Sequence, residues 1–281
     1  MSKTSKLWIV PPFVVLAAVF FYPLTLIAIE AFHLDQGAGG YGLANFARVL
    51  GSVLFQNALI HTIVIALMAT AGCLLLGFVL AVILAFVPFT GSAMVARLIE
   101  TYIALPSFLL TLAFTFIYGS AGILNGIAVK HWGMDEPPVH FLYSMAGVVL
   151  AEVTAFTPFV LRPLLAAFSQ FESGQIEVAA SLGAKPWRIV RSIIFPAALP
   201  ALLVGGSLCL LLTVNEFGIV LFIGAKGVIT LPMLIYGKSI QEGDYVSACT
   251  IALINIVISL GLYSLYNRVV NGLGKEHAGL V

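Results

Sequence analysis

Residues 58–87 read ALIHTIVIALMATAGCLLLGFVLAVILAFV, a run of thirty residues without Asp, Glu, Lys or Arg. A hydrocarbon layer of roughly 30 Å is crossed by a helix of about 20 residues, because only a helix satisfies all of its backbone hydrogen bonds internally. The stretch therefore predicts a membrane-spanning helix, and similar runs decide the fold of the whole chain.

Five further apolar runs are long enough to span a membrane. They cover residues 7–29, 98–118, 139–161, 197–223 and 246–266. The first run follows Lys3 and Lys6, as a secretory signal would, but its length and the lack of a small-residue cleavage site before Glu30 favour a retained helix. Six spans predict an all-α integral membrane bundle.

The order of these runs predicts how the chain is organised. We expect an N-terminal helix and outer loop in 1–56, a main transmembrane domain in 57–266, and a cytoplasmic tail in 267–281. If the N-terminus lies in the cytoplasm, the cytoplasmic segments hold nine Lys and Arg residues and the outer segments hold four. This asymmetry satisfies the positive-inside rule, and an even number of spans puts both termini in the cytoplasm.

The composition excludes several classes of protein. Hydrophobic residues make up 61% of the 281 residues and charged residues 9%, so a water-soluble enzyme is excluded. A net charge of +1 supplies no field that would hold nucleic acid. Cys73, Cys209 and Cys249 stand singly inside apolar runs, which favours small core residues over a disulfide framework or a metal site.

Three acidic residues, Glu100, Glu152 and Glu216, fall inside the predicted spans. Glu152 lies about 20 Å along the fourth span, where an ionised carboxylate costs at least about 2.5 to 3.5 kcal/mol unless it is paired or hydrated. It either lines a polar cavity between the spans or is half of a structural pair, for which His61 is a candidate. Glu216 follows Asn215 near the outer end of the fifth span, where it either belongs to a hydrated helix end or lines the same kind of cavity.

The largest cytoplasmic loop, 168–196, has its own pattern. Ser173 can cap a short helix, and Gly183 supplies the permissive backbone on which such a helix ends. Pro186 suits the first turn of a second helix, 187–195, whose mixed apolar and basic faces are typical of a helix at the membrane interface. The loop predicts a helix, a turn and a helix, which either dock a partner or only pack as a connector.

The stretch EVAASLGA at 177–184, followed by Phe195 and Pro196, resembles the EAA loop of permease subunits of ATP-binding-cassette (ABC) importers. Glu177, Ala179, Gly183 and Pro196 match that motif, whereas Val178 and Phe195 depart mildly from it. The resemblance extends over about residues 41–266 and includes the six-span topology. It implies the type I importer fold.

In that family the short helix of the EAA loop couples the permease to its motor. The resemblance implies that Glu177, Ala179, Ala180 and Gly183 meet a cytoplasmic ATPase dimer, which holds the ATP and Mg²⁺. It further implies a second permease subunit, identical or related, and a periplasmic or extracellular solute-binding protein. The chain itself is then a transport subunit of the bacterial inner membrane, without catalytic residues, cofactor or bound metal.

The tract from Asn215 to Gly237 is similar to permeases of the 2-aminoethylphosphonate branch, which lies close to the ferric-iron and polyamine branches. Uptake of 2-aminoethylphosphonate is therefore the expected function, with polyamine, ferric iron or another small solute as alternatives. In such a permease, Glu152, Glu216, Asn215 and His61 are the candidates for the translocation pathway. A solute that carries an ammonium group would suit Glu152 or Glu216 as its counter-ion.

Two other function classes make different predictions. A secondary transporter or channel predicts an internal repeat and broken helices, and no convincing repeat is present. Gly237, Lys238 and Ser239 look like the end of a phosphate-binding P-loop, but Pro232 stands where that motif requires glycine. This segment therefore gives the chain no ATP site of its own.

Overall fold

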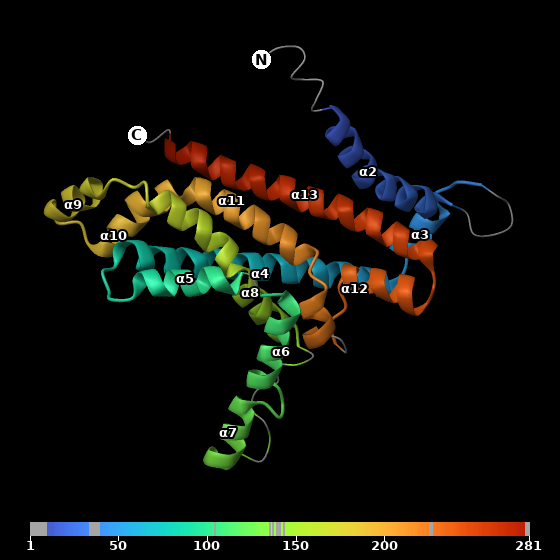
Figure 1. Cartoon of the computed structure of the whole chain (residues 1–281), viewed down its shortest axis with the longest axis horizontal. Coiled ribbons are helices and arrows are strands. Elements are labelled where there is room, and N and C mark those ends of the chain that lie inside the picture. Colours follow the sequence, from blue (N-terminus) through green and yellow to red (C-terminus); the bar gives the residue numbers. More distant parts are fainter. Residues whose placement is uncertain are drawn as a thin grey trace. The chain divides into compact units, whose positions relative to one another are not determined.

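The computed structural model describes residues 10–33, 40–103, 105–134, 136, 138, 142, 144–224 and 227–278 (Figure 1). Within these residues the secondary structure is helical, apart from an isolated bridge between His33 and Tyr41. The prediction of an all-α chain is confirmed. The α-helices are α2 (Val10–Phe32), α3 (Ala44–Leu50), α4 (Val53–Phe86), α5 (Ser92–Tyr102), α6 (Ser107–Tyr118), α7 (Ile123–Trp132), α8 (Met145–Phe168), α9 (Ser173–Ser181), α10 (Pro186–Ile189), α11 (Phe195–Val214), α12 (Leu231–Tyr236) and α13 (Tyr245–Ala278). The π-helical turns are η1 (Val190–Ile194), η2 (Val220–Gly224) and η3 (Gly237–Gln241).

Six stretches of the described chain are long and apolar enough to cross a membrane, which agrees with the predicted number. They are Pro11–Phe32, Val53–Phe86, Leu109–Trp132, Met145–Phe168, Pro186–Val214 and Tyr245–Val269. The first of them, within α2, exposes most of its apolar side chains. Such a surface suits contact with lipid or with another membrane protein.

The predicted third span, 98–118, is wrong as a single helix. It is divided between α5 and α6, and Pro106 lies between them in an extended conformation with φ −58° and ψ 139°. Proline has no N–H to donate and disfavours helix in the residue before it, so the chain breaks here. Residues 119–138 connect the predicted third and fourth spans, but they contain α7, and the apolar stretch of the structure runs on to Trp132.

The fourth and fifth spans are also shifted. Ser144 caps α8 by accepting a hydrogen bond from the Gly147 N–H at 3.0 Å, and the helix continues to Phe168 instead of ending at 161. The apolar stretch that contains the fifth span starts at Pro186, not at 197. The separate interfacial helix expected over 187–195 is therefore wrong, because α10, η1 and α11 follow one another without a break.

The chain divides into two compact units. Residues 1–59 and 230–258 form the first unit, and residues 60–229 and 259–281 form the second. In the first unit, the buried Asn45 side chain of α3 donates hydrogen bonds to the carbonyls of Ala31 (3.2 Å) and His33 (2.7 Å). Thr250 of α13 donates to the same Ala31 carbonyl at 3.3 Å. These bonds join α3, the end of α2 and the start of α13.

In the second unit, α8 packs extensively against α11, and glycines permit the close approach. A Cβ on Gly205 of α11 would lie 2.8 Å from the Cα of Val160 in α8, and a Cβ on Gly77 of α4 would lie 2.9 Å from a Val160 methyl group. Backbones that approach this closely leave no room for a side chain. Gly77 and Gly205 therefore allow α4 and α11 to pack closely against α8.

Candidate functional site

The helix α9 ends in a glycine turn whose geometry is defined by two hydrogen bonds. Gly183 N–H donates to the Ala180 carbonyl at 2.9 Å, and Ala184 N–H donates to the Ala179 carbonyl at 3.0 Å. Gly183 has φ +81°, in the left-handed region that favours glycine. This pair of bonds is a Schellman motif, so the predicted stop at Gly183 is confirmed.

The start of α9 differs by one residue from the expectation. Glu172, not Ser173, occupies the cap position, and no side-chain hydrogen bond closes this end of the helix. After the turn, Pro186 takes the first helical position of α10, where its missing N–H costs nothing. The helix, turn and helix predicted for this loop are therefore present, although the second helix continues into the fifth apolar stretch.

The helix–turn–helix of residues 173–189 carries exposed apolar side chains. Val178 is 60% exposed, Leu182 84% and Trp187 73%. A hollow of about 310 Å³ lies beside them, lined by Ala179, Leu182, Gly183, Ala184, Arg188, Ile189, Ser192 and Ile193. Apolar groups exposed together around a hollow favour contact with a partner, since scattered single ones would need no explanation.

Among the four residues that the sequence assigned to coupling, Glu177 and Ala180 are exposed and Ala179 is half-buried. Gly183 is also exposed, and a Cβ placed on it would meet nothing within 4 Å. All four lie within this one helix and its turn, so the structure brings them together. The requirement for glycine at position 183 comes from the backbone angle and not from crowding within the chain.

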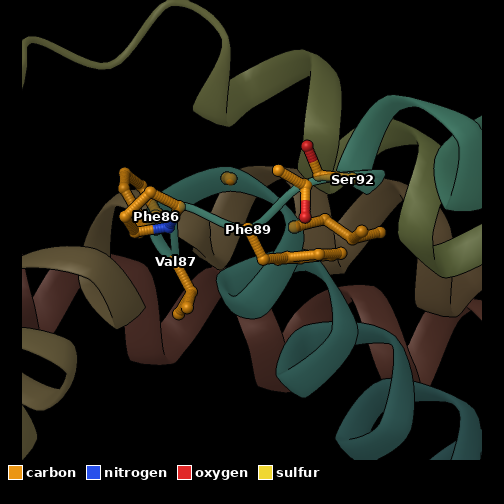
Figure 2. A pocket seen from close by; sticks show the side chains of 8 residues that line it. Phe86, Val87, Phe89 and Ser92 are labelled. Carbon is orange, nitrogen blue, oxygen red and sulfur yellow. The ribbon is translucent and has the colours of Figure 1, made fainter.

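A second hollow lies at the turn between α4 and α5, with a volume of about 660 Å³ (Figure 2). Figure 2 shows Phe86, Val87, Phe89 and Ser92 around it. The Phe86 ring packs against the rings of Phe168 and Phe171, with centroids 5.0 and 5.8 Å apart. The turn therefore contacts the segment that leads into α9. The sequence does not reveal this contact, because Phe86 lies about eighty residues before Phe168 and Phe171 along the chain.

Glu152 lies in the interior of the second unit. Its side chain is 0% exposed, and neither carboxylate oxygen makes a hydrogen bond within the described residues. The pairing with His61 is therefore absent from this part of the chain, and that alternative is wrong. His61 Nδ1 lies instead 3.1 Å from the Ile229 carbonyl oxygen.

The surroundings of Glu152 contain the two buried cysteines. Cys73 Sγ lies 3.6 Å from the Val153 carbonyl and 4.0 Å from that of Glu152. Cys73 and Cys209 are buried free thiols, as expected for core cysteines, whereas Cys249 is half-buried. The described residues contain no group of three or more His, Cys, Asp or Glu that could hold a metal ion.

The helix α11 ends at Val214, and Asn215 and Glu216 follow it as a break in the helix. The Asn215 side chain donates to the Leu211 carbonyl at 2.8 Å and lies 3.5 Å from the Ser259 hydroxyl. Glu216 Oε1 accepts a hydrogen bond from the Ile219 N–H at 2.9 Å and so caps the next helical segment. Glu216 is also close enough to Glu152 for the two carboxylates to interact. The structure therefore brings Glu152, Asn215 and Glu216 to one region of the unit, whereas the His61 ring lies within hydrogen-bonding distance of the Ile229 carbonyl.

The chain has six candidate spans, and an exposed helix–turn–helix lies between α8 and α11. Together these features are typical of a multi-span membrane permease. Residues 74–275 match the family described as binding-protein-dependent transport system inner membrane component, and the chain belongs to this family of ABC importer permeases.

Two further comparisons agree with this family. A relative from Salmonella typhimurium, provisionally named 2-aminoethylphosphonate transport system permease protein PhnU, is 59% identical over 95% of this chain and 92% of its own length. The solved structure of a bacterial ABC transporter involved in the import of the acidic polysaccharide alginate covers 96% of this chain and 96% of its own, at a TM-score of 0.82 and 17% identity. A second structure, of an alginate ABC transporter in complex with a periplasmic protein bound to an alginate pentasaccharide, covers 97% of this chain at a TM-score of 0.81 and 20% identity.

Proposed function

We propose that this permease forms the pathway by which 2-aminoethylphosphonate crosses the bacterial inner membrane. The observation that carries the proposal is the 59% identity, over nearly the full length of both chains, to a relative provisionally named for 2-aminoethylphosphonate transport. At this similarity the residues that contact the solute are expected to be largely shared.

Transport is driven by a separate ATPase dimer that seats on the helix–turn–helix of residues 173–189. Exposed apolar side chains at Val178, Leu182 and Trp187 support this assignment, together with the small residues at the adjacent hollow. Ala179 lets the partner approach closely, Gly183 fixes the direction of the turn, and the exposed Glu177 offers a polar contact. ATP and Mg²⁺ belong to the partner, and this chain serves as a transport subunit and not as an enzyme.

Two permease subunits, identical or related, enclose the pathway, and a periplasmic binding protein delivers the solute. The alginate transporter of similar fold was solved with such a protein, which supports this arrangement. In our proposal both termini lie in the cytoplasm. This orientation places most of the Lys and Arg residues of the loops and termini on the cytoplasmic side, as the positive-inside rule predicts. The helix–turn–helix of residues 173–189 then faces the cytoplasm, where the ATPase is.

The pathway residues are Glu152, Asn215 and Glu216, with His61 as a further candidate. The break after Val214 supports this assignment, because helix breaks at membrane depth are tolerated where they line a cavity. Glu152 is buried in the described conformation, so it reaches the solute only when the helices around it move apart. Burying a carboxylate without a hydrogen-bond partner costs folding free energy, and a role in solute transport explains why an acid stands at this position.

Uptake of labelled 2-aminoethylphosphonate by a strain without other phosphonate transport tests the proposal. Cells that express the chain with its ATPase and binding protein are expected to accumulate the label. Accumulation should stop when the ATPase carries a substitution that prevents ATP hydrolysis. Uptake of spermidine or ferric iron in place of the phosphonate would assign the chain to another branch, and transport by the purified chain alone would indicate a secondary transporter.

A further inference from the structure

A small polar hollow in the first unit has no role in the function described so far. It has a volume of about 160 Å³ and is formed by the end of α3, the start of α4, α12 with η3, and the start of α13. Its lining residues are Arg48, Val49, Ser52, Leu54, Phe55, Leu234, Lys238, Asp244, Ser247 and Ile251. A water molecule occupies about 30 Å³ in the liquid, so the hollow admits a small solute and not only a single water.

Three charged groups of the hollow lie near one another. Partial burial raises the pKa of Asp244, but hydrogen bonds from Ser247 and the nearby charges of Lys238 and Arg48 outweigh it, so the pKa is lowered from its usual value. Asp244 is therefore a carboxylate at neutral pH. Its Oδ1 accepts the Ser247 N–H at 3.0 Å and so caps α13.

The two cations keep donors for a ligand. Arg48 Nη2 makes two long hydrogen bonds, 3.3 Å to Asn45 Oδ1 and 3.5 Å to Ser247 Oγ. A guanidinium has five N–H donors in a planar fork that suits phosphate-like groups, so most of its donors are not used by these bonds. Lys238 forms an ion pair with Glu242 at 2.5 Å, and an ammonium has three donors.

The mixture of charges selects one class of solute. A simple anion in the hollow would meet the Asp244 carboxylate, and a simple amine would meet Arg48 and Lys238. A small zwitterion can place its negative group at the cations and its ammonium group at Asp244, so it is the class that avoids both repulsions. 2-Aminoethylphosphonate carries both groups on a chain of two carbons.

We infer that this hollow is a binding site for a small zwitterionic phosphonate, with Arg48 and Lys238 at the phosphonate group and Asp244 at the ammonium group. The inference rests on the proposed function. In the orientation proposed above, a single span separates the cytoplasmic N-terminus from Arg48. The hollow then opens on the outer side, where the binding protein releases its solute. It serves as a first docking position for the solute on that side of the membrane.

Phosphorus-31 NMR on the complete importer in lipid nanodiscs, without binding protein, tests the site. The 2-aminoethylphosphonate signal is expected to broaden more than that of ethylphosphonate, which lacks the ammonium group. Asp244→Asn keeps a residue that can cap α13 but removes the charge, and it should reduce the broadening to the level of ethylphosphonate. Arg48→Gln should weaken binding of both phosphonates.

Matched controls remove charges elsewhere. Lys130→Gln removes an exposed cation of α7, and Glu136→Gln removes an exposed acid that does not line the hollow. Neither is expected to reduce the broadening. Equal broadening by the two phosphonates, or unchanged broadening with Asp244→Asn, would overturn the site. A third result would also overturn it. If free phosphonate shows no broadening and Arg48→Gln abolishes association with the binding protein, the hollow is a docking surface for that protein.

Uptake measurements separate this inference from the proposed function. With saturating binding protein, Asp244→Asn is expected to raise the KM for 2-aminoethylphosphonate by about threefold to fivefold, the range expected for an exposed charge pair. If the unaltered importer transports the phosphonate and Asp244→Asn leaves its KM unchanged, the site is wrong and the proposed function stands. If the unaltered importer does not transport it, the proposed function itself fails.

Discussion

At the residue scale, glycine is required at position 183 by the backbone conformation and not by close contacts. Its φ of +81° disfavours any side chain, although a Cβ would meet nothing within 4 Å. Gly183→Ala is expected to cost about 1 to 2 kcal/mol locally and to distort the turn, which lowers ATP-driven uptake. Gly183→Asp adds a charge to the same surface and should abolish uptake while the protein stays in the membrane.

Gly174 provides the control for this prediction. It also lies in α9 and also has open space around its Cα, but its φ is not in the left-handed region. Gly174→Ala should stabilise the helix by about 0.5 to 1 kcal/mol and leave uptake intact. Normal uptake at normal protein levels with Gly183→Asp would remove Gly183 from the coupling surface.

Glu152 makes a second prediction at this scale. Its carboxylate is 0% exposed and makes no hydrogen bond within the described residues, so it destabilises the described conformation. Glu152→Gln is expected to raise the Tm of the purified protein and to lower uptake by about tenfold, equivalent to roughly 1.4 kcal/mol. Glu136→Gln, which alters an exposed acid, should change neither quantity. A higher Tm with full uptake would show that Glu152 is not a pathway residue.

At the element scale, the contact of α8 with α11 depends on one position. A Cβ on Gly205 would lie 2.8 Å from the backbone of Val160, and backbone cannot rotate away as a side chain can. Gly205→Ala is expected to destabilise the protein by about 1 to 3 kcal/mol, measured as a lower Tm in detergent. Gly261→Ala in α13, where a Cβ meets nothing within 4 Å, should be neutral or slightly stabilising. Equal effects of the two substitutions would contradict the close packing.

The elements also show which parts of the fold could be predicted from sequence. Span number and the α9 turn follow from local signals, namely long apolar runs and a glycine after a helix. The bounds of the third and fifth spans do not, because Pro106 and Pro186 act differently. Pro106 interrupts a helix, whereas Pro186 starts one that continues through η1. Whether a proline breaks or begins a helix depends on the residues that satisfy its neighbours' hydrogen bonds.

Contacts between residues that are distant along the chain could not be predicted from the sequence, for a different reason. Phe86 meets Phe168 and Phe171 through folding of the second unit, and Arg48 meets Ser247 through folding of the first. No local pattern marks these pairs. Glu152 illustrates the same limit, since its burial was predictable from its place in an apolar run but its lack of a partner was not.

At the scale of the whole molecule, the importer works only if membrane and motor subunits hold together. Leu182 is 84% exposed next to the Gly183 turn, so an ATPase that seats on α9 would bury it. Burying a leucine contributes about 1.5 to 3 kcal/mol, and Leu182→Ser is therefore expected to weaken association with the ATPase by about tenfold or more. Pull-down of the ATPase by the permease in detergent, over a range of ATPase concentrations, measures the change.

The matched substitution is Ile240→Ser, because Ile240 is also apolar and 66% exposed but lies in the other compact unit, in η3. In the proposed orientation η3 faces away from the ATPase, so Ile240→Ser should leave association unchanged. If both substitutions weaken association equally, the effect comes from general loss of folding. If Ile240→Ser alone weakens it, the membrane orientation is the reverse of the proposed one, and the motor sits at the opposite end of the spans.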